Sequence, residues 1–418
     1  MQSIQASIIT IGDELLIGQV IDTNSAWMAQ QLNHAGIRVI RRVAVGDVWD
    51  EIWQALEEET KIADIILITG GLGPTADDIT KPLLCKYFNG KMVVNQEALK
   101  NVQHIFENIL KRPMIERNAK QAEVPDTCTV IQNKRERPQA CGFNKNNKIF
   151  VSMPGVPYEM KGMMEEYVIP ALLQQFKPPH ITHRTLLTAG IGESYLAELI
   201  KDFETALPSY IKLAYLPGYG LLRLRLSSTG GDKEKVEKDI QQQFDELQIL
   251  VKDYLVSNLD ETMEEVVAKL LLSNNKTVST AESCTSGHIA QLFTAMAGAS
   301  AYYNGSVISY SYQAKEDLLQ VNHETLTNKG AVSEEVVIEM AKGALANLKS
   351  DFTIAVSGIM GPGGGLPDKP VGTVWVAVAS KQKIKTNKFQ FRFDRQRNIQ
   401  LTAMNALNML RQFILDNP

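Results

Sequence analysis

The sequence has few cysteines, no excess of positive charge and no long apolar run, and each shortage excludes a class of protein. Its 418 residues include four cysteines, at positions 85, 128, 141 and 284, without a CxxC pair or zinc-ligand spacing. This argues against a disulfide framework or a structural zinc site and fits a reducing cytoplasm. A formal net charge of −4 gives no electrostatic reason to expect direct binding of nucleic acid. No apolar run reaches the roughly 20 residues that cross a membrane, and the N-terminus lacks the basic flank and apolar core of a signal peptide. We therefore expect a cytoplasmic protein with no membrane partner.

The length and the hydrophobic pattern indicate an α/β protein of several domains, because 418 residues exceed one ordinary core. We place domains at residues 1–177, 178–257 and 258–418. In the first, apolar strand segments alternate with helical spacing, which predicts a parallel sheet covered by helices on both faces. The expected strands are Ala6–Ile11, Val39–Val45 and Asp64–Thr69, and the expected helices are Thr23–Ala35 and Asp50–Thr60.

The middle segment has the pattern of a small α+β domain. We expect strands at Thr182–Leu187 and Leu221–Ser227 and helices at Ser194–Phe203 and Lys233–Leu247. Arg223 and Arg225 alternate with leucines, as on a half-exposed strand. A basic strand could contact RNA, but a solvated face is the simpler interpretation.

In the C-terminal domain we expect helices at Met263–Leu272, Ser333–Leu348 and Asn398–Leu415. The further strand candidates are Ser306–Ser309, Phe352–Val356 and Val374–Ala379.

Two turns of the N-terminal domain carry residues suited to phosphate and metal binding. Gly12 and Asp13 follow the first strand, and the loop 70–78 follows the central strand. In an open parallel sheet, ligands bind beyond the carboxyl ends of the strands. Glycines let the backbone approach phosphate oxygens, Thr75 offers a hydroxyl, and Asp13, Asp77 and Asp78 could hold a hard divalent cation. The alternative is a tight turn in which the aspartates cap the helix near Ile79.

One turn of the C-terminal domain places a hydroxyl next to a thiol. Thr277–Ala281 reads as a strand and His288–Phe293 as the start of a helix, with Ser283 and Cys284 between them. Free amides and the positive end of a helix dipole favour an anion at such a turn, which suits a nucleophile or an oxyanion site. A plain helix cap by Ser283 or Thr285 would explain the turn equally well on its own.

The N-terminal motifs resemble those of the CinA (competence/damage-inducible protein A) family. They are Gly12-Asp13-Glu14, the loop 70–78, residues 117–122 (Arg-Asn-Ala-Lys-Gln-Ala) and residues 153–160 (Met-Pro-Gly-Val-Pro-Tyr-Glu-Met). The resemblance implies a three-layer α/β/α domain similar to MogA and MoaB. It also implies an ADP-ribose pyrophosphatase that yields AMP and ribose 5-phosphate with Mg, Mn or Co, and possibly K⁺. By this resemblance Asp13 and Asp78 would be the metal ligands. The nucleotide contacts would be Gly12, Gly70, Gly71, Gly73, Thr75, Asn118, Lys120, Gln121 and Gly155.

The C-terminal motifs resemble the nicotinamide mononucleotide deamidase domain of the same family. They are the 280–287 turn, residues 310–315 (Tyr-Ser-Tyr-Gln-Ala-Lys), 330–333, 357–365 and 369–373. The resemblance implies hydrolysis of a carboxamide with release of ammonia and needs no cofactor. Ser283 would be the nucleophile, Lys315 the base, and Tyr310 a proton relay or an orienting group. Thr285, Ser286 and Gly287 would form the oxyanion hole, Ser357, Gly358 and Gly361 would close over the ribose phosphate, and Arg395 and Arg397 would pair with the phosphate.

Alternatives remain for each of these roles. Lys315 could be a solvated lysine, Tyr310 could be core packing, and the two arginines could lie on an exposed turn. Cys284 is a rival nucleophile, because a thiolate at a helix N-terminus is activated. Two positions also depart from the family pattern. Ser286 replaces a glycine, which would strain a turn that needs a positive φ, and Tyr312 replaces an asparagine beside Gln313.

Two functions are therefore open from the sequence. The first is a bifunctional hydrolase of pyridine-nucleotide salvage, acting on nicotinamide mononucleotide and ADP-ribose. The second is a non-catalytic pterin- or nucleotide-binding protein that acts in competence through protein partners. The resemblance also suggests a homodimer.

Overall fold

The computed structural model describes residues 4–73, 75, 78–133, 139–178, 180–230 and 232–417. The chain forms two compact units. The first comprises residues 1–181 with 229–235, and the second comprises residues 182–228 with 236–418. The three expected domains correspond to three main sheets, and the second unit holds both the middle and the C-terminal sheet.

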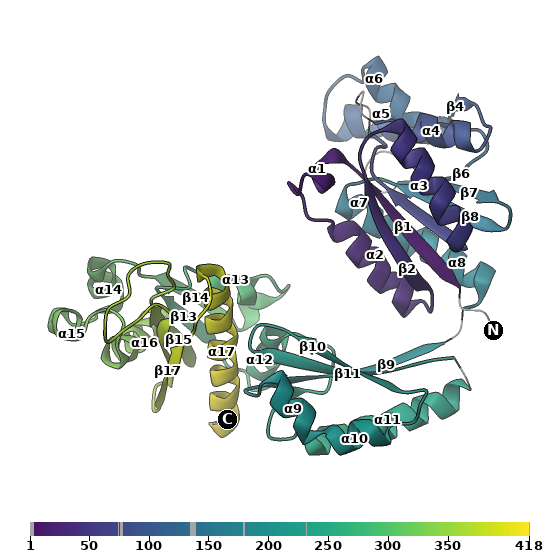
Figure 1. Ribbon diagram of the computed structural model, residues 1–418. Coiled ribbons are helices and arrows are strands. Elements are labelled where there is room, and N and C mark those ends of the chain that lie inside the picture. Colours follow the sequence, from purple (N-terminus) through teal and green to yellow (C-terminus); the bar gives the residue numbers. More distant parts are fainter. Residues whose placement is uncertain are drawn as a thin grey trace. The chain divides into compact units, whose positions relative to one another are not determined.

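The first unit contains a six-stranded sheet in the order β2-β1-β3-β8-β7-β6 (Figure 1). Its strands are β1 (Gln5–Ile11), β2 (Arg38–Val45), β3 (Ile65–Thr69), β6 (Thr129–Ile131), β7 (Ala140–Lys145) and β8 (Lys148–Met153). Strands β2, β1, β3 and β8 are parallel, whereas β7 and β6 are antiparallel additions, so the expectation of a purely parallel sheet is wrong at this edge. Asn146 and Asn147, both with positive φ, join β7 to β8 in a tight hairpin, because asparagine tolerates the left-handed region better than most residues.

Two hydrophobic cores, one on each face of this sheet, confirm the three-layer arrangement. One face packs α2 (Thr23–His34), α7 (Pro157–Met163) and α8 (Ile169–Phe176) against residues such as Ile8 and Leu67. The other packs α3 (Trp49–Ile62) and α4 (Thr80–Tyr87) against Ile9 and Ile68. Neighbours in β1 and β3 thus point to opposite faces, which is why these buried strands are apolar throughout. The outlying elements are α1 (Asp13–Leu16), α5 (Gln96–His104), α6 (Glu116–Ala119), β4 (Met92–Val94) and β5 (Glu123–Pro125).

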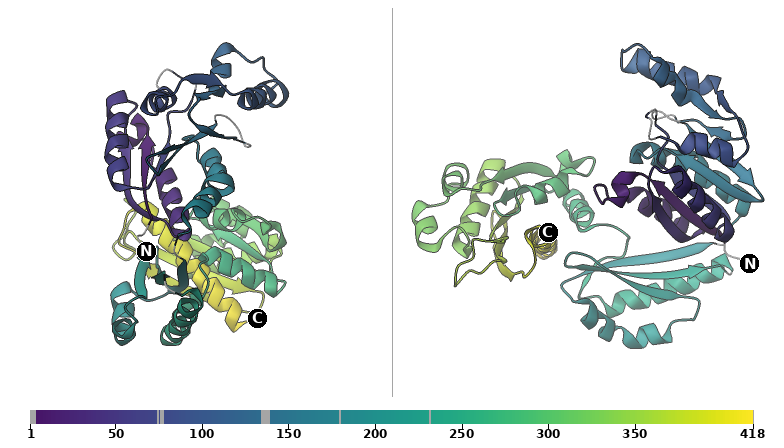
Figure 2. Two further views of the ribbon diagram at one scale, coloured as in Figure 1. Left: turned by 90° about the vertical axis from the view of Figure 1, so that its right-hand side faces the viewer. Right: turned by 45° about the horizontal axis from the view of Figure 1, so that its top comes forward.

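The middle sheet has the order β10-β11-β9-β12. Its strands are β9 (Ile181–Ala189), β10 (Lys212–Pro217), β11 (Leu221–Thr229) and β12 (Leu255–Ser257). Helices α9 (Glu193–Leu199), α10 (Lys201–Ala206) and α11 (Lys233–Leu250) supply apolar residues to the core with this sheet (Figure 2). The single helix expected over 194–203 is two helices that meet at Ile200. Arg223 is partly buried and bonded to the Glu261 carbonyl at 3.1 Å, so it does not lie on a freely solvated face.

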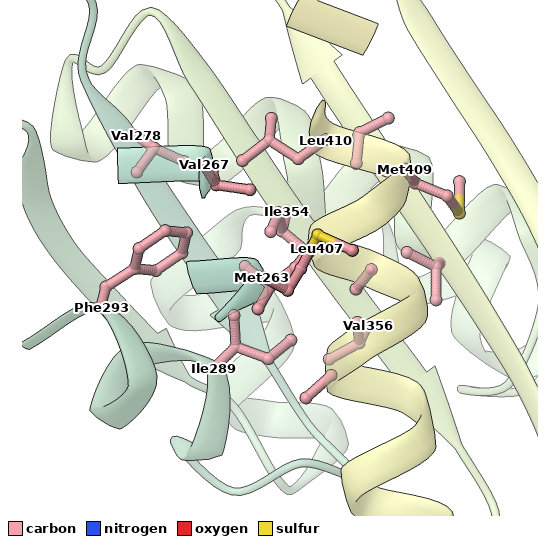
Figure 3. Packing of buried hydrophobic residues seen from close by; sticks show 14 of the residues in the cluster. Met263, Val267, Val278, Ile289, Phe293, Ile354, Val356, Leu407, Met409 and Leu410 are labelled. Carbon is pink, nitrogen blue, oxygen red and sulfur yellow. The ribbon is translucent and has the colours of Figure 1, made fainter. Parts of the chain in front are cut away.

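The C-terminal sheet has the order β14-β13-β15-β16-β17. Its strands are β13 (Val278–Glu282), β14 (Tyr303–Ile308), β15 (Phe352–Gly358), β16 (Thr373–Ser380) and β17 (Ile384–Gln390). The first three positions in the sheet are parallel, and β16 and β17 are antiparallel. Helices α12 (Met263–Ser273), α13 (His288–Thr294) and α17 (Arg395–Asp416) pack on one face, where Phe293, Ile354 and Leu407 meet in the core (Figure 3). Helices α14 (Tyr312–Leu319), α15 (His323–Lys329) and α16 (Glu334–Leu348) lie on the other.

Candidate active site

The turn from β13 into α13 is built for a tight change of direction. The Ser283 amide donates to the Val356 carbonyl at 3.1 Å, which extends the pairing of β13 with β15 up to the turn. Ser286 and Gly287 then take φ values of 54° and 90°. Position 286 thus has the positive φ under which a serine would be strained, and this exposed serine adopts a left-handed conformation that glycine accepts more readily.

The anion at the start of α13 is the chain's own Glu282, a role that the sequence analysis missed. Its carboxylate is fully buried and accepts hydrogen bonds from the amides of Gly287, Ile289 and Ala290 at 2.8–3.1 Å. The Thr285 hydroxyl also donates to it, at 2.7 Å. An apolar run followed by glutamate just before a helix start was the available signal, because a buried carboxylate needs such donors.

This arrangement corrects the expected oxyanion hole. The Gly287 amide is used by Glu282, and the Ser286 amide donates to the Ser283 carbonyl at 3.3 Å. Thr285 contributes its hydroxyl to Glu282 and not to the pocket. Among the described residues of this turn, the backbone amides of Cys284 and Thr285 donate no hydrogen bond to a carbonyl or a carboxylate.

Lys315 lies beside Ser283, as the sequence predicts for a base. It is on α14, whose N-terminus is capped by the Ser311 side chain, and none of its surface is exposed. Its Nζ is 3.0 Å from the Ser283 Oγ, 2.6 Å from the Ser309 carbonyl oxygen and 3.3 Å from the Tyr310 carbonyl oxygen. Burial lowers the pKa of Lys315 to about 8, because desolvation disfavours the ammonium.

These three contacts suit a neutral amine. The two N–H groups of an uncharged lysine can donate to the two carbonyls, and its lone pair then faces the hydroxyl of Ser283. The solvated-lysine alternative is excluded by the burial of this side chain. The contact between Ser283 and Lys315 has the geometry that a nucleophilic hydroxyl and its base would need.

Cys284 is a poor rival. Its side chain packs in the core with Val356 and Met360, and burial raises the pKa of its thiol to about 12. A thiol with such a pKa is protonated near neutral pH, so the nucleophilic thiolate is scarce.

The Ser283 hydroxyl opens into a pocket of about 240 Å³. The pocket is lined by Ser283, Cys284, Tyr310, Ala331, Val332, Ser357, Gly358, Ile359, Met360, Gly361, Gly363, Gly364 and Arg395. The predicted Ser357, Gly358, Gly361 and Arg395 are thus brought together with Ser283. Arg397 is not, because its guanidinium lies over the Phe393 ring at 3.9 Å.

Two side chains fix the wall of this pocket. The Ser357 hydroxyl donates to the Ala331 carbonyl at 2.7 Å, and the Ala331 amide donates to the Tyr312 hydroxyl at 3.2 Å. Tyr312, the departure from the family pattern, therefore supports the wall from behind. Arg395, which also lines the pocket, donates to the Gly361 carbonyl at 3.0 Å.

Tyr310 reaches the pocket but not the nucleophile. Its side chain is 69% exposed, which excludes the core-packing alternative. Within the described residues, its hydroxyl has no hydrogen bond to Ser283 or Lys315, and only its carbonyl meets Lys315. The role of Tyr310 as a proton relay stays a prediction, because no hydrogen bond among the described residues links its hydroxyl to Ser283 or Lys315.

A second, smaller cavity of about 120 Å³ lies at the carboxyl ends of the parallel strands in the first unit. Thr10, Asn24, Thr69 and Gly155 contribute to its lining. Asn24 donates to the Gly155 carbonyl at 2.7 Å and Thr69 to the Pro154 carbonyl at 2.8 Å, which ties the 154–157 turn to the sheet. Gly155 thus lines a strand-end cavity, and its contact with a nucleotide stays a prediction.

At two positions the glycines of the loop after β3 make a tight turn against the chain itself, which was the alternative to a phosphate site. A Cβ on Gly70 would lie 2.2 Å from the Ile11 carbonyl oxygen, and one on Gly71 would lie 2.2 Å from the Thr80 hydroxyl. Asp78 accepts hydrogen bonds from the Gly73 amide at 2.7 Å and from the Thr75 amide and hydroxyl, so it closes its own loop.

The expected metal ligands are similarly occupied. Asp13 accepts from the Asp47 amide at 3.1 Å, and Gly12, which precedes it, donates to the Val45 carbonyl at 3.0 Å. Across the described part of the chain, no three His, Cys, Asp or Glu side chains gather to hold a metal ion. Asp77 lies outside the described residues. The described residues therefore do not by themselves fit a divalent cation.

The remaining N-terminal candidates lie on α6 and the short 3₁₀ turn that follows it, Lys120–Ala122. Asn118 and Lys120 are partly or fully exposed, and Gln121 is buried with its carbonyl bonded to the Lys81 Nζ at 2.9 Å. None of the three lines the strand-end cavity.

Comparison with known proteins agrees with these three parts of the chain. The probable molybdopterin binding domain matches residues 7–174, the damage-inducible protein CinA KH domain matches 183–257, and the CinA C-terminal domain matches 260–414. A CinA-like protein of Cytophaga hutchinsonii is 44% identical over 409 residues, which is 98% of each chain. The chain belongs to the CinA family. A CinA-like protein of Flavobacterium psychrophilum is 42% identical over 99% of each chain.

Solved structures match single domains of this CinA-family chain. The competence damage-inducible protein A of Klebsiella pneumoniae is 35% identical, and the match covers 38% of this chain and all of that chain, with a TM-score of 0.37. No helix among the residues described has both the length and the apolar character needed to cross a membrane.

Proposed function

We propose that the C-terminal domain deamidates nicotinamide mononucleotide to nicotinate mononucleotide and ammonia. The observation that carries this proposal is the 3.0 Å contact between the Nζ of the fully buried Lys315 and the Oγ of Ser283, a residue that lines a pocket. An amide is a poor electrophile, so its hydrolysis needs an activated nucleophile of this kind.

The reaction follows from the positions of these groups. Ser283 attacks the carboxamide carbon while neutral Lys315 takes the hydroxyl proton. The resulting lysine ammonium then gives that proton to the departing amide nitrogen, which leaves as ammonia. Water, deprotonated by the same amine, hydrolyses the nicotinoyl ester and restores Ser283.

The phosphate end of the substrate would meet Arg395. Its guanidinium uses one N–H on the Gly361 carbonyl and lies at the edge of the pocket, on the N-terminal turn of α17. Guanidinium suits phosphate because it offers several parallel donors and stays charged. The oxyanion of the tetrahedral intermediate would accept from the Cys284 amide, since Cys284 lines the pocket and its amide donates to no other carbonyl or carboxylate among the described residues, whereas Thr285 does not line the pocket.

The direct test is ammonia release from nicotinamide mononucleotide by the purified full-length protein. The proposal expects turnover by the native chain, none by Ser283→Ala, and substantial turnover by the neighbouring Cys284→Ala. Folded protein that releases no ammonia would favour the alternative of a non-catalytic nucleotide- or pterin-binding protein that acts through protein partners.

For the N-terminal domain we propose binding of a nucleotide pyrophosphate such as ADP-ribose at the strand-end cavity. It is supported by the position of this cavity beyond β1 and β3 and by the polar side chains of Asn24 and Thr69 within it. Hydrolysis to AMP and ribose 5-phosphate is the activity to assay, with Mg²⁺, Mn²⁺ or Co²⁺ and with chelator. Equal cleavage in chelator would remove Asp13 and Asp78 as metal ligands.

A further inference from the structure

Two of the four cysteines lie together in the first unit, although they are 13 residues apart in the sequence. Cys128 comes immediately before β6, and Cys141 is in β7, the neighbouring antiparallel strand. Their Sγ atoms are 3.0 Å apart, and both cysteines are free. The sequence shows no cysteine motif here, because this pairing depends on strand register and not on spacing in the chain.

The two thiols differ in access. Cys141 is buried, with 3% of its surface exposed, whereas Cys128 is only half-buried. A small oxidant in solution therefore reaches Cys128 first, and Cys141 is already in contact to react with the product. This combination of one accessible thiol and one adjacent resolving thiol is typical of redox-sensitive pairs.

A buried lysine favours the thiolate form of Cys128 while its amine is protonated, and burial lowers the pKa of that amine. Lys81, on α4, is buried with its Nζ bonded to the Gln121 carbonyl, and its charge acts on both cysteines. The hydrogen bond with Cys141 is the main cause that lowers the pKa of Cys128, and the charge of Lys81 lowers it further, against the opposing effect of burial. The same hydrogen bond and burial raise the pKa of Cys141, so the thiolate forms at the accessible member of the pair.

We propose that Cys128 and Cys141 are a reversible disulfide site that responds to hydrogen peroxide or a related hydroperoxide. The Cys128 thiolate attacks one peroxide oxygen, the O–O bond breaks, and the released hydroxide takes up a proton to leave as water. The Cys141 thiol then attacks the sulfur of the resulting sulfenic acid, the S–O bond breaks, and a second water leaves as the S–S bond forms. Each sulfur gives up one electron, and the peroxide takes up both.

The other two cysteines serve as internal references. Cys85 is buried on α4, and burial raises its thiol pKa. Cys284 is buried in the C-terminal domain with a thiol pKa of about 12. Neither lies within hydrogen-bond contact of another cysteine among the described residues, so both should stay reduced under mild oxidation.

The test uses the reduced full-length protein, one equivalent of hydrogen peroxide and mass spectrometry after alkylation of the remaining thiols. We expect loss of two of the four alkylatable thiols. Trypsin, which cuts after Lys134 between the two cysteines, should yield a 128–141 disulfide-linked peptide pair that a thiol reductant separates. Retention of all four thiols, over-oxidation of Cys128 without a bond to Cys141, or covalent dimers through Cys128 would overturn the proposal.

Single substitutions test which residues form the disulfide and which residue promotes its formation. Cys141→Ser should abolish the linked peptides and let Cys128 accumulate as a sulfenic or more oxidised species, whereas Cys85→Ser on the same unit should leave the linkage intact. Lys81→Met should slow disulfide formation several-fold near neutral pH, with the difference shrinking at high pH, where Cys128 ionises without help. Equal rates for Lys81→Met and the native chain at every pH would remove Lys81 from the site, and loss of two thiols to a disulfide in Cys141→Ser, as fast as in the native chain, would disprove the pairing.

Discussion

The Nζ of Lys315 and the Oγ of Ser283 lie 3.0 Å apart in a position where Lys315 has no exposed surface. One contact thus unites the two residues that a nucleophilic hydrolase needs, and burial supplies the lowered pKa that makes the lysine a usable base near physiological pH. Two carbonyls satisfy its N–H groups, so the lone pair is directed to the serine.

The proposed deamidase activity should depend on pH through this lysine. The base must be neutral, and its pKa of about 8 means that the fraction of active enzyme grows as pH rises through that value. We expect kcat/KM for nicotinamide mononucleotide to climb about tenfold per pH unit below pH 7 and to level off above pH 9. Steady-state rates between pH 6 and 10 test this. A profile that falls across this range would show that the ammonium form is the active one.

Replacement of this lysine should separate activity from stability. Lys315→Met keeps the length and apolar character of the side chain but removes the base, so deamidation should fall by roughly 10²–10⁴-fold or more. The same change should raise the free energy of unfolding at pH 7, because the native state no longer holds a buried ammonium.

The sign of this gain with pH is fixed by linkage. The folded pKa of Lys315 lies below the unfolded value, so the unfolded chain binds more protons between about pH 8 and pH 10.5, and the native protein becomes more stable relative to the unfolded chain as pH rises through that window. The stability advantage of Lys315→Met should therefore be largest below pH 8 and shrink above it. Urea unfolding at pH 7 and pH 10 measures the difference, with the exposed Lys349→Met as the control that should show no such trend.

The sequence predicts which residues belong to this site better than it predicts where their side chains point. Ser283 and Lys315 could be predicted because they stand in long motifs, and the helix start after the strand was visible in the pattern. The glutamate before the helix start was a signal for the use of the turn's amides, but it was not enough for a prediction, because that use depends on where the Glu282 side chain points and a glutamate at the end of a strand is usually exposed. For the same reason Arg395 and Arg397 looked equivalent, although one lines the pocket and the other lies on Phe393.

In the fold, too, the sequence predicts local features such as apolar strands better than contacts between distant residues. Strands β1 and β3 are recognisable because burial on both faces makes them apolar throughout. The antiparallel strands β6 and β7 were missed because β6 has only three residues and β7 is partly polar. The glycines at 70 and 71 signalled a close approach, but the sequence could not show that the approaching group is the chain's own Ile11 carbonyl or Thr80 hydroxyl and not a phosphate.

Glu282 should be essential to the geometry of the nucleophile turn. Glu282→Gln replaces one acceptor oxygen by an NH₂ group that faces backbone N–H donors, so at least one amide loses its partner at a cost of about 1–3 kcal/mol. We expect a lower urea midpoint and a deamidase rate reduced more in kcat than in KM, since Ser283 shifts while the phosphate end at Arg395 does not. Glu324→Gln, an exposed acid on α15, is the matched control and should change neither quantity. If Glu282→Gln has the same stability and the same kcat as the native chain, the turn holds its shape without the carboxylate.

Ser286 offers the opposite change, a gain of stability from a smaller side chain. At a φ of 54° its Cβ crowds the backbone, and a non-glycine residue in this region costs about 1 kcal/mol. Ser286→Gly removes that strain but gives the unfolded chain more freedom, so we expect a net gain of about 0.5 kcal/mol with the deamidase rate kept within about twofold. Ser273→Gly, at the end of α12 in right-handed helical backbone, is the control and should lose stability by about 0.5–1 kcal/mol. Urea unfolding of the two variants and the native chain measures these changes in the free energy of unfolding. If Ser286→Gly loses as much stability as Ser273→Gly, the serine does not strain the left-handed turn, and its replacement of the family's glycine does not lower the stability of this protein.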